Sequence, residues 1–128
     1  MKTHAGLWID HRHAVVVLLT DGVENVQDIQ SGVEKHVRFS GGNAAELGST
    51  EDVRDRQFQN HLNTYYDEVI AVIREAEAIQ IFGPGEAKGE LEKRLQHAGL
   101  AARTLPIETT DKMTALHIAE KVRTRFAG

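Results

Sequence analysis

The stretch AIQIFGPGEAKGELEKRLQH, residues 78–97, carries three elements in a fixed order. Residues 78–82 form a short apolar run that contains one polar residue, Gln80. The Gly-Pro-Gly sequence at 83–85 then interrupts regular structure, because glycine and proline are strong local breakers. Apolar side chains recur at helical spacing over 86–97. A strand, a tight turn and an amphipathic helix in this order predict a βα unit of a parallel sheet.

The residue types in the turn of this βα unit predict its backbone conformation. Gly85 is expected to place its backbone where a side chain would clash. Pro84 fixes its own φ and gives up a backbone donor that a loop does not need. Glu86 is expected at the helix N-terminus, where negative charge is favourable.

Three strands are predicted before this unit. Leu7–Ile9 predicts the first, Ala14–Leu19 the second and Val23–Ile29 the third. A polar break separates the first two, and an Asp-Gly hairpin signal at 21–22 precedes the third. The second strand is aliphatic and β-branched throughout, which is typical of a central strand buried on both faces. The third strand is more polar and is expected at an edge.

A long helix over Asp52–Glu77 is predicted just before the βα unit. Its apolar residues recur at helical spacing. They are Phe58, Leu62, Tyr65, Tyr66, Val69, Val72 and Ile73. Ser49 or Thr50 is expected to cap this helix. The segment 31–50 ahead of it holds four glycines and predicts a long flexible loop.

A strand and a helix are predicted after the unit. Leu100–Ile107 predicts the last strand, and Pro106 confines it to an edge or a strand end. Thr109 or Thr110 is expected to cap a final helix that ends at Phe126. The residues expected to face the core from this helix are Met113, Leu116, Ala119, Val122 and Phe126.

The predicted order is β-β-β-α-β-α-β-α. A hairpin meander followed by two right-handed crossovers gives an α/β fold with a five-stranded mixed sheet flanked by helices. This is the order of ribonuclease-H-like folds. The first strand is expected at the centre, paired with the second and the fourth, and the fifth is expected at an edge. We predict one domain over residues 1–128.

Composition limits the classes of function. The chain has a net charge of −4 and no cysteine, so disulfide and thiol chemistry are excluded. No apolar run reaches the roughly 20 residues of a membrane span. The chain begins almost directly with a strand, which leaves no room for a signal peptide. We therefore expect a cytoplasmic protein without a membrane partner. A nucleic-acid binder is usually basic on at least one face, so RNA contact would require a local basic patch.

The turn sequence Gly-Pro-Gly-Glu-Ala-Lys at 83–88, placed after an apolar strand, resembles the middle domain of the eukaryotic and archaeal class-1 peptide-chain release factors and their Pelota relatives. Residues 7–14 look like the opening hairpin of that domain, and 23–26 look like its third strand. The resemblance covers about Leu7 to Phe126 in order. It implies a bacterial single-domain relative of this group, a translational-machinery-component-like protein, with the ribosome or tRNA as its partner.

In release factors, the loop before the long helix carries Gly-Gly-Gln, and the glutamine is tied to positioning water for peptidyl-tRNA hydrolysis. The corresponding residues here are Gly41, Gly42 and Asn43. Asparagine is one methylene shorter, and a displacement of about 1 Å can cost about 100-fold in rate. Pelota relatives lack the motif and bind ribosomes without hydrolysis. We therefore expect a binding module rather than an enzyme, with no cofactor, and residual peptidyl-tRNA hydrolase activity is an alternative.

Two segments are candidates for contact with RNA or the ribosome. The residues are Arg38, Gly41, Gly42 and Asn43 in the loop, Arg54 and Arg56 at the helix start, and Gly83, Gly85 and Lys88 at the Gly-Pro-Gly turn. Basic side chains meet phosphates and glycines let a backbone approach closely, while a helix N-terminus attracts anions. The alternatives are a mobile loop whose acidic residues offset the arginines, and a purely structural turn. The turn is not a nucleotide P-loop, because it lacks Gly-x4-Gly-Lys-Ser/Thr.

The Asp-His-x-His sequence formed by Asp10, His11 and His13 could supply metal ligands. A metal-dependent nuclease would also need further carboxylates, for which Glu77 and Glu108 are the candidates. The alternative is a polar hairpin turn with exposed imidazoles. A third hypothesis is a self-associating protein, a homo-oligomer that pairs through the edge strands at 23–29 or 100–107.

Overall fold

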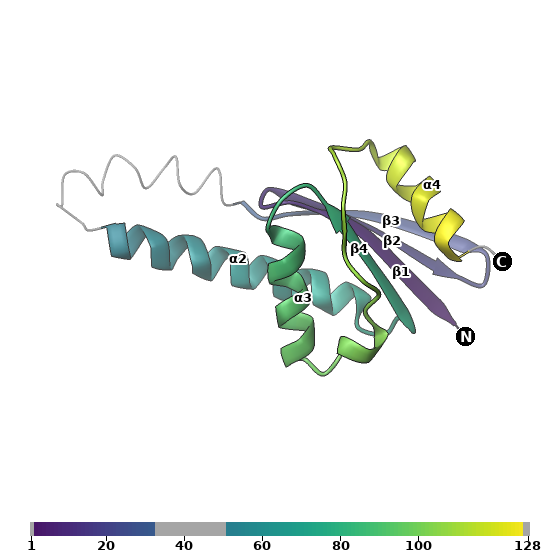
Figure 1. Cartoon of the computed structure of the whole chain (residues 1–128), viewed down its shortest axis with the longest axis horizontal. Coiled ribbons are helices and arrows are strands. Elements are labelled where there is room, and N and C mark those ends of the chain that lie inside the picture. Colours follow the sequence, from purple (N-terminus) through teal and green to yellow (C-terminus); the bar gives the residue numbers. More distant parts are fainter. Residues whose placement is uncertain (1, 33–50, 127–128) are drawn as a thin grey trace.

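The computed structural model describes residues 2–32 and 51–126, with side chains omitted for 51–57. Five strands form one sheet in the order β3-β2-β1-β4-β5, and Figure 1 labels β1 to β4. Their bounds are β1 Thr3–Ile9, β2 His13–Thr20, β3 Val23–Gln30, β4 Ala78–Gly83 and β5 Glu108–Thr109. The central strand β1 pairs antiparallel with β2 and parallel with β4. This is the strand order predicted for a ribonuclease-H-like fold, and that prediction is confirmed.

Helices cover both faces of the sheet (Figure 1). Their bounds are α2 Glu51–Ile73, α3 Ala87–His97, the short 3-10 helix η1 Ala101–Arg103 and α4 Ala115–Phe126. Side chains of β1 alternate between two clusters. Leu7 and Ile9 pack with α2 and α3, whereas Trp8 packs with α4. The fold is therefore a three-layer α/β arrangement with a core on each side of the sheet.

The hairpin between β2 and β3 follows the sequence prediction. Asp21 and Gly22 both have positive φ, 49° and 82°. This pair of values is that of a type I′ turn, whose twist matches the flanking strands. β3 then lies at the edge of the sheet with almost every side chain exposed, as its polar sequence predicts.

The turn after β4 depends on a different glycine from the one predicted. A Cβ on Gly83 would lie 2.2 Å from the carbonyl oxygen of Ile9, closer than any real contact. A Cβ on Gly85 would meet nothing within 4 Å, so the prediction for Gly85 was wrong. Glycine is required at 83 because β1 and β4 approach closely where both strands end.

The region after α3 differs from the prediction. Within the predicted strand at 100–107, Ala101–Arg103 form η1, and Thr104 makes one isolated bridge to Ile79. The strand itself comes later, as the two residues of β5 beside Phe82 and Gly83. The predicted edge position of the fifth strand is confirmed, because β5 is the last strand of the sheet.

The final helix also begins later than predicted. It starts at Ala115, and the hydroxyl of Thr114, rather than that of Thr109 or Thr110, accepts a hydrogen bond from the His117 backbone N–H at 3.2 Å. Leu116 is 71% exposed and does not face the core. The long helix α2 ends at Ile73, four residues before the predicted end. Within the described residues, no helix is both long and apolar enough to span a membrane.

Candidate functional site

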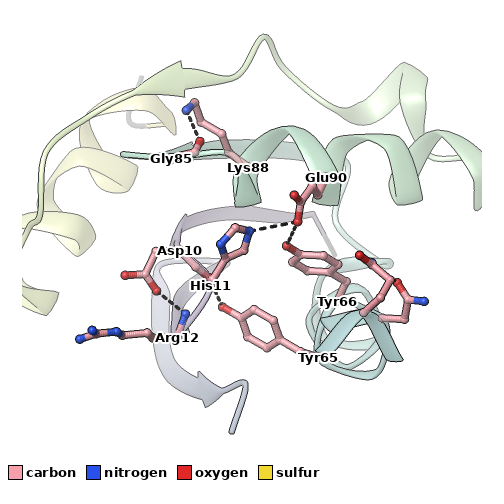
Figure 2. A network of polar contacts seen from close by, with 10 residues as sticks. Asp10, His11, Arg12, Tyr65, Tyr66, Gly85, Lys88 and Glu90 are labelled. Carbon is pink, nitrogen blue, oxygen red and sulfur yellow. Dashed lines mark hydrogen bonds and ion pairs between the residues drawn. The ribbon is translucent and has the colours of Figure 1, made fainter. Parts of the chain in front are cut away.

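The β4–α3 turn lies at the sheet edge where β1 and β4 both end (Figures 1 and 2). Gly83 is buried there, while Gly85 is exposed. The ammonium group of Lys88 donates a hydrogen bond to the Gly85 carbonyl oxygen at 2.5 Å. Lys88 therefore closes its own turn, and its charge remains near the exposed backbone of the turn.

The neighbouring β1–β2 turn is held by Asp10. One carboxylate oxygen accepts hydrogen bonds from the backbone N–H of Arg12 at 2.8 Å and of His13 at 2.9 Å. The backbone N–H of Asp10 donates to the His13 carbonyl oxygen at 3.1 Å. A short acidic side chain that bonds its own following backbone is a common device in tight turns. The Asp10 carboxylate thus has a structural role in this turn.

Two adjacent tyrosines of α2 lie beside these turns (Figure 2), on the face of the sheet that α2 covers. The hydroxyl of Tyr65 donates to the carbonyl oxygen of Asp10 at 2.9 Å. The hydroxyl of Tyr66 donates to a Glu90 carboxylate oxygen of α3 at 2.5 Å. Both rings are buried in the core. The tyrosines therefore tie α2 to the β1–β2 turn and to α3.

Burial is the main cause of a raised pKa at both tyrosines, because it disfavours the phenolate form. The nearby charge of Asp10 adds to the effect at Tyr65, and the hydrogen bond to Glu90 adds to it at Tyr66. Both hydroxyls therefore remain protonated donors at neutral pH.

His11 completes a small polar network at this edge. Its Nε2 lies 3.1 Å from the same Glu90 oxygen that Tyr66 contacts. Its ring lies 6.3 Å from the ring of Phe58 in an edge-on arrangement. His11 and Glu90 are both 38% exposed, so their pair is open to solvent on one side. The network of His11, Glu90 and Tyr66 joins three segments that are distant in the sequence.

The three residues proposed as metal ligands do not converge. The Asp10 carboxylate caps the turn, and the His11 ring points towards Glu90 (Figure 2). The His13 ring instead lies 3.3 Å from an Asp28 oxygen and 5.3 Å from the centre of the Trp8 ring, on the α4 side. No group of three or more histidine or acidic residues suited to a metal occurs in the described part of the chain. This geometry favours the polar-turn interpretation.

The extra carboxylates of the nuclease hypothesis are also not assembled. Glu77 immediately precedes β4 and its backbone bonds to Thr3, at the opposite end of β1 from Asp10. Glu108 is paired with Lys121 of α4 at 2.9 Å.

Four predicted loop residues, Arg38, Gly41, Gly42 and Asn43, lie outside the described residues. Arg54 and Arg56 lie in the first turns of α2, and their side chains are also outside the description. They precede Phe58, whose ring contacts His11. Of the predicted site, the structure thus places Gly83, Gly85 and Lys88 together.

Sequence reasoning missed Glu90 and the roles of the tyrosines. Tyr65 and Tyr66 were predicted only as core residues, and hydrophobic periodicity carries no information on their hydroxyls. Glu90 lies one turn into α3, next to the apolar stripe of Ala87 and Leu91. This position could have indicated a contact, because a polar residue beside the apolar stripe of a helix lies at the border with the element that the stripe packs against.

No protein-family model matches the sequence, and a search of curated proteins finds no match. Solved structures do share the fold. Pelota from Thermoplasma acidophilum matches 96% of this chain with a TM-score of 0.56 and 14% identity. The archaeal translation termination factor aRF1 matches 96% with a TM-score of 0.59 and 12% identity. Pelota from Archaeoglobus fulgidus matches 97% with a TM-score of 0.56 and 14% identity.

These likenesses define a Pelota- and release-factor-like fold for this chain. The chain spans about a third of the length of each of these structures, 32%, 34% and 31%. At such low identities the likeness shows the fold alone, and function is a separate inference.

Proposed function

We propose that this protein is a translation-associated module that binds the ribosome or tRNA and catalyses no reaction of its own. The observation that carries the proposal is the likeness of nearly the whole chain to part of a translation termination factor, with a TM-score of 0.59. The turn sequence at 83–88, which resembles the release-factor middle domain, supports it independently. We further propose that it is a bacterial protein that works in the cytoplasm.

The proposed contacts come from the loop before α2, the start of α2 and the β4–α3 turn. They are Arg38, Gly41, Gly42, Asn43, Arg54, Arg56, Gly83, Gly85 and Lys88. The polar network below the turn supports this assignment, because it fixes α2, α3 and the β1–β2 turn relative to one another. A rigid base limits the conformational freedom that is lost when such a turn binds a partner.

The absence of catalysis is proposed from a single residue. Asn43 stands where the resemblance implies a glutamine, and its side chain is one methylene shorter. The proposal therefore predicts ribosome association without peptide release. Hydrolysis of peptidyl-tRNA by the purified protein, lost on replacing Asn43 with alanine, would contradict it.

The contact assignment is tested with purified ribosomes. A variant with Arg38, Arg54 and Arg56 replaced by alanine should pellet less with ribosomes and show a weaker salt dependence, because fewer phosphates are neutralised. A matched control removes three cations elsewhere, Lys2, Lys112 and Arg125, and should pellet like the wild type. If both variants pellet equally with ribosomes, the assignment of these arginines to the contact surface is wrong.

Self-association remains a second candidate, because a specific feature favours it. β3 is one of the two edge strands of the described sheet, and its Val23 and Val26 are 67% and 46% exposed. An exposed edge strand has unpaired backbone groups that can pair with another chain. A dimer in light scattering that dissociates on Val26→Lys substitution would support this function over ribosome binding.

A further inference from the structure

A basic groove lies between the C-terminal halves of α2 and α3. Its volume is about 540 Å³. Among the residues that the structure describes, its lining includes Arg74, Lys93, Arg94 and His97 and a single acidic residue, Asp67. This concentration of positive charge contrasts with the net charge of −4 of the whole chain.

Asp67, the acidic side chain found in the described lining, is already paired with a cation. Asp67 pairs with the guanidinium of Arg94 at 2.6 Å, and Arg94 also donates to the Asn63 amide oxygen at 3.3 Å. The Nε of Arg94 is buried and has no acceptor among the described residues. Arg94 therefore anchors the wall of the groove and holds its positive charge in place.

The other basic side chains of the groove are available for a ligand. Arg74, Lys93 and His97 are exposed, and their side chains make no hydrogen bond or ion pair within the described ranges 2–32 and 51–126. Arg103 of η1 adds a further charge nearby, because its guanidinium donates to the Arg74 carbonyl oxygen at 3.1 Å. If the Asp67–Arg94 pair is counted as neutral, Arg74 and Lys93 still give the groove two uncompensated positive charges.

The apolar part of the groove's lining indicates the kind of partner. It consists of Ile70, Ala71 and Ala98, and Ile70 is mostly buried. A protein partner usually gains affinity by placing aromatic or large apolar anchors into pockets. These residues offer only small apolar contacts, whereas the basic lining residues offer guanidinium and ammonium groups that suit phosphate oxygens.

We infer that this groove binds the phosphate backbone of RNA. The groove is separate from the contact surface proposed at the Gly-Pro-Gly turn. That turn precedes the first residue of α3, whereas the groove lies beside the last turn of α3. The choice of RNA among polyanions rests on the proposed function. The presence of a basic groove does not depend on that function. Binding here would let the module contact RNA at both ends of α3.

The test measures binding of the purified chain to a fluorescent single-stranded oligouridylate of 12 nucleotides at several salt concentrations. The variant Arg74→Gln with Lys93→Gln removes two cations and should bind severalfold more weakly. The slope of log affinity against log salt should fall by about 1.4, since each single-strand phosphate contact contributes about 0.7. The control Lys112→Gln with Arg125→Gln removes two exposed cations at the α4 side and should retain the wild-type slope.

Cations near helix C-termini also stabilise the helix, so thermal melting accompanies each variant. If the double variant fails to fold, Lys93→Gln alone is used, because Lys93 is exposed and should lower the slope by about 0.7. No binding by the wild type, or an unchanged slope in a folded groove variant, overturns the inference. Equal losses in the groove and control variants also overturn it.

A polyglutamate peptide is the second probe. Tighter binding of polyglutamate than of RNA would overturn the assignment of RNA and indicate an acidic protein partner. If oligouridylate binds in the groove but the wild type does not associate with ribosomes, the proposed function is wrong and the groove inference is supported. If ribosomes bind and groove variants match the wild type, the groove inference alone fails.

Discussion

Glu90 of α3 accepts a hydrogen bond from the Tyr66 hydroxyl of α2 at 2.5 Å. The two residues are separated by 24 positions and by the whole of β4. The same Glu90 oxygen lies 3.1 Å from His11, just after the central strand. One carboxylate therefore holds together the elements that position the β4–α3 turn.

Replacing Tyr66 with phenylalanine should destabilise the fold more than replacing Tyr65. Hydrogen bonds to charged groups contribute about 1.5–3 kcal/mol, whereas those to neutral acceptors contribute about 0.5–1.5 kcal/mol. Tyr66 bonds to a carboxylate and Tyr65 bonds to a backbone carbonyl oxygen. Urea unfolding of the two variants measures the difference. The reverse order of stability, or two neutral variants, would show that the network does not act as described.

The protein should lose stability in alkali before its tyrosines titrate in the folded state. Burial raises the pKa of both Tyr65 and Tyr66 above the ordinary value of about 10. A group whose pKa is raised on folding stabilises the folded state fully below its unfolded pKa. This contribution is lost as pH rises through the folded value.

Absorbance at the phenolate band tests this directly, because the chain has only these 2 tyrosines. The band should appear together with the loss of circular dichroism above about pH 10. A phenolate signal that rises near pH 10 while the fold stays intact would mean that the tyrosines are accessible.

Gly83→Ala should destabilise the chain strongly, while Gly85→Ala should be almost neutral. The added methyl group at 83 would lie 2.2 Å from the Ile9 carbonyl oxygen, so the central strands would have to separate. Overpacking of this kind costs about 1–3 kcal/mol, and more where backbone blocks the methyl group. Thermal melting of both variants checks the prediction, and similar melting temperatures would refute the close approach of β1 and β4.

Gln80→Leu should stabilise the protein. Gln80 is only 8% exposed, and its Oε1 is buried without a hydrogen-bond partner among the described residues. An unsatisfied buried polar group costs about 1–3 kcal/mol, which an apolar side chain of similar size would recover in part. The exposed Gln96 gives a control, since Gln96→Leu should bring no gain. A lower melting temperature for Gln80→Leu would indicate that the carboxamide has a partner.

The strand order could be predicted because each strand had a local signal. The apolar run at 78–82 and the aliphatic run at 14–19 specified buried strands, and Asp21-Gly22 specified the hairpin. The right-handed crossover rule then left few ways to arrange them. These features depend on residues close in the sequence.

The errors arose where contacts between distant residues decide the outcome. Gly83 and Gly85 look equivalent in the sequence, and only the approach of Ile9 distinguishes them. Leu116 matched the helical spacing of Met113, but the helix begins only at Ala115, and its buried face is set by Ile118, Ala119 and Val122.

The candidate site was predicted only in part, for the same reason. The Gly-Pro-Gly turn has a local sequence signature, whereas the bond between Tyr66 and Glu90 depends on how α2 and α3 cross. Arg74, Lys93 and His97 are spread over 24 positions of the sequence, 74–97, and line one groove only in the folded chain. A search for runs of basic residues therefore does not find the groove.

Sedimentation of the tagged protein in a sucrose gradient of cell lysate tests the central claim most directly. At low salt the protein should migrate with ribosomal particles, and this association should fade at moderate salt, since counterion release weakens phosphate contacts. A protein that remains at the top of the gradient at both salt concentrations would contradict a role in translation, although its Pelota-like fold would be unaffected.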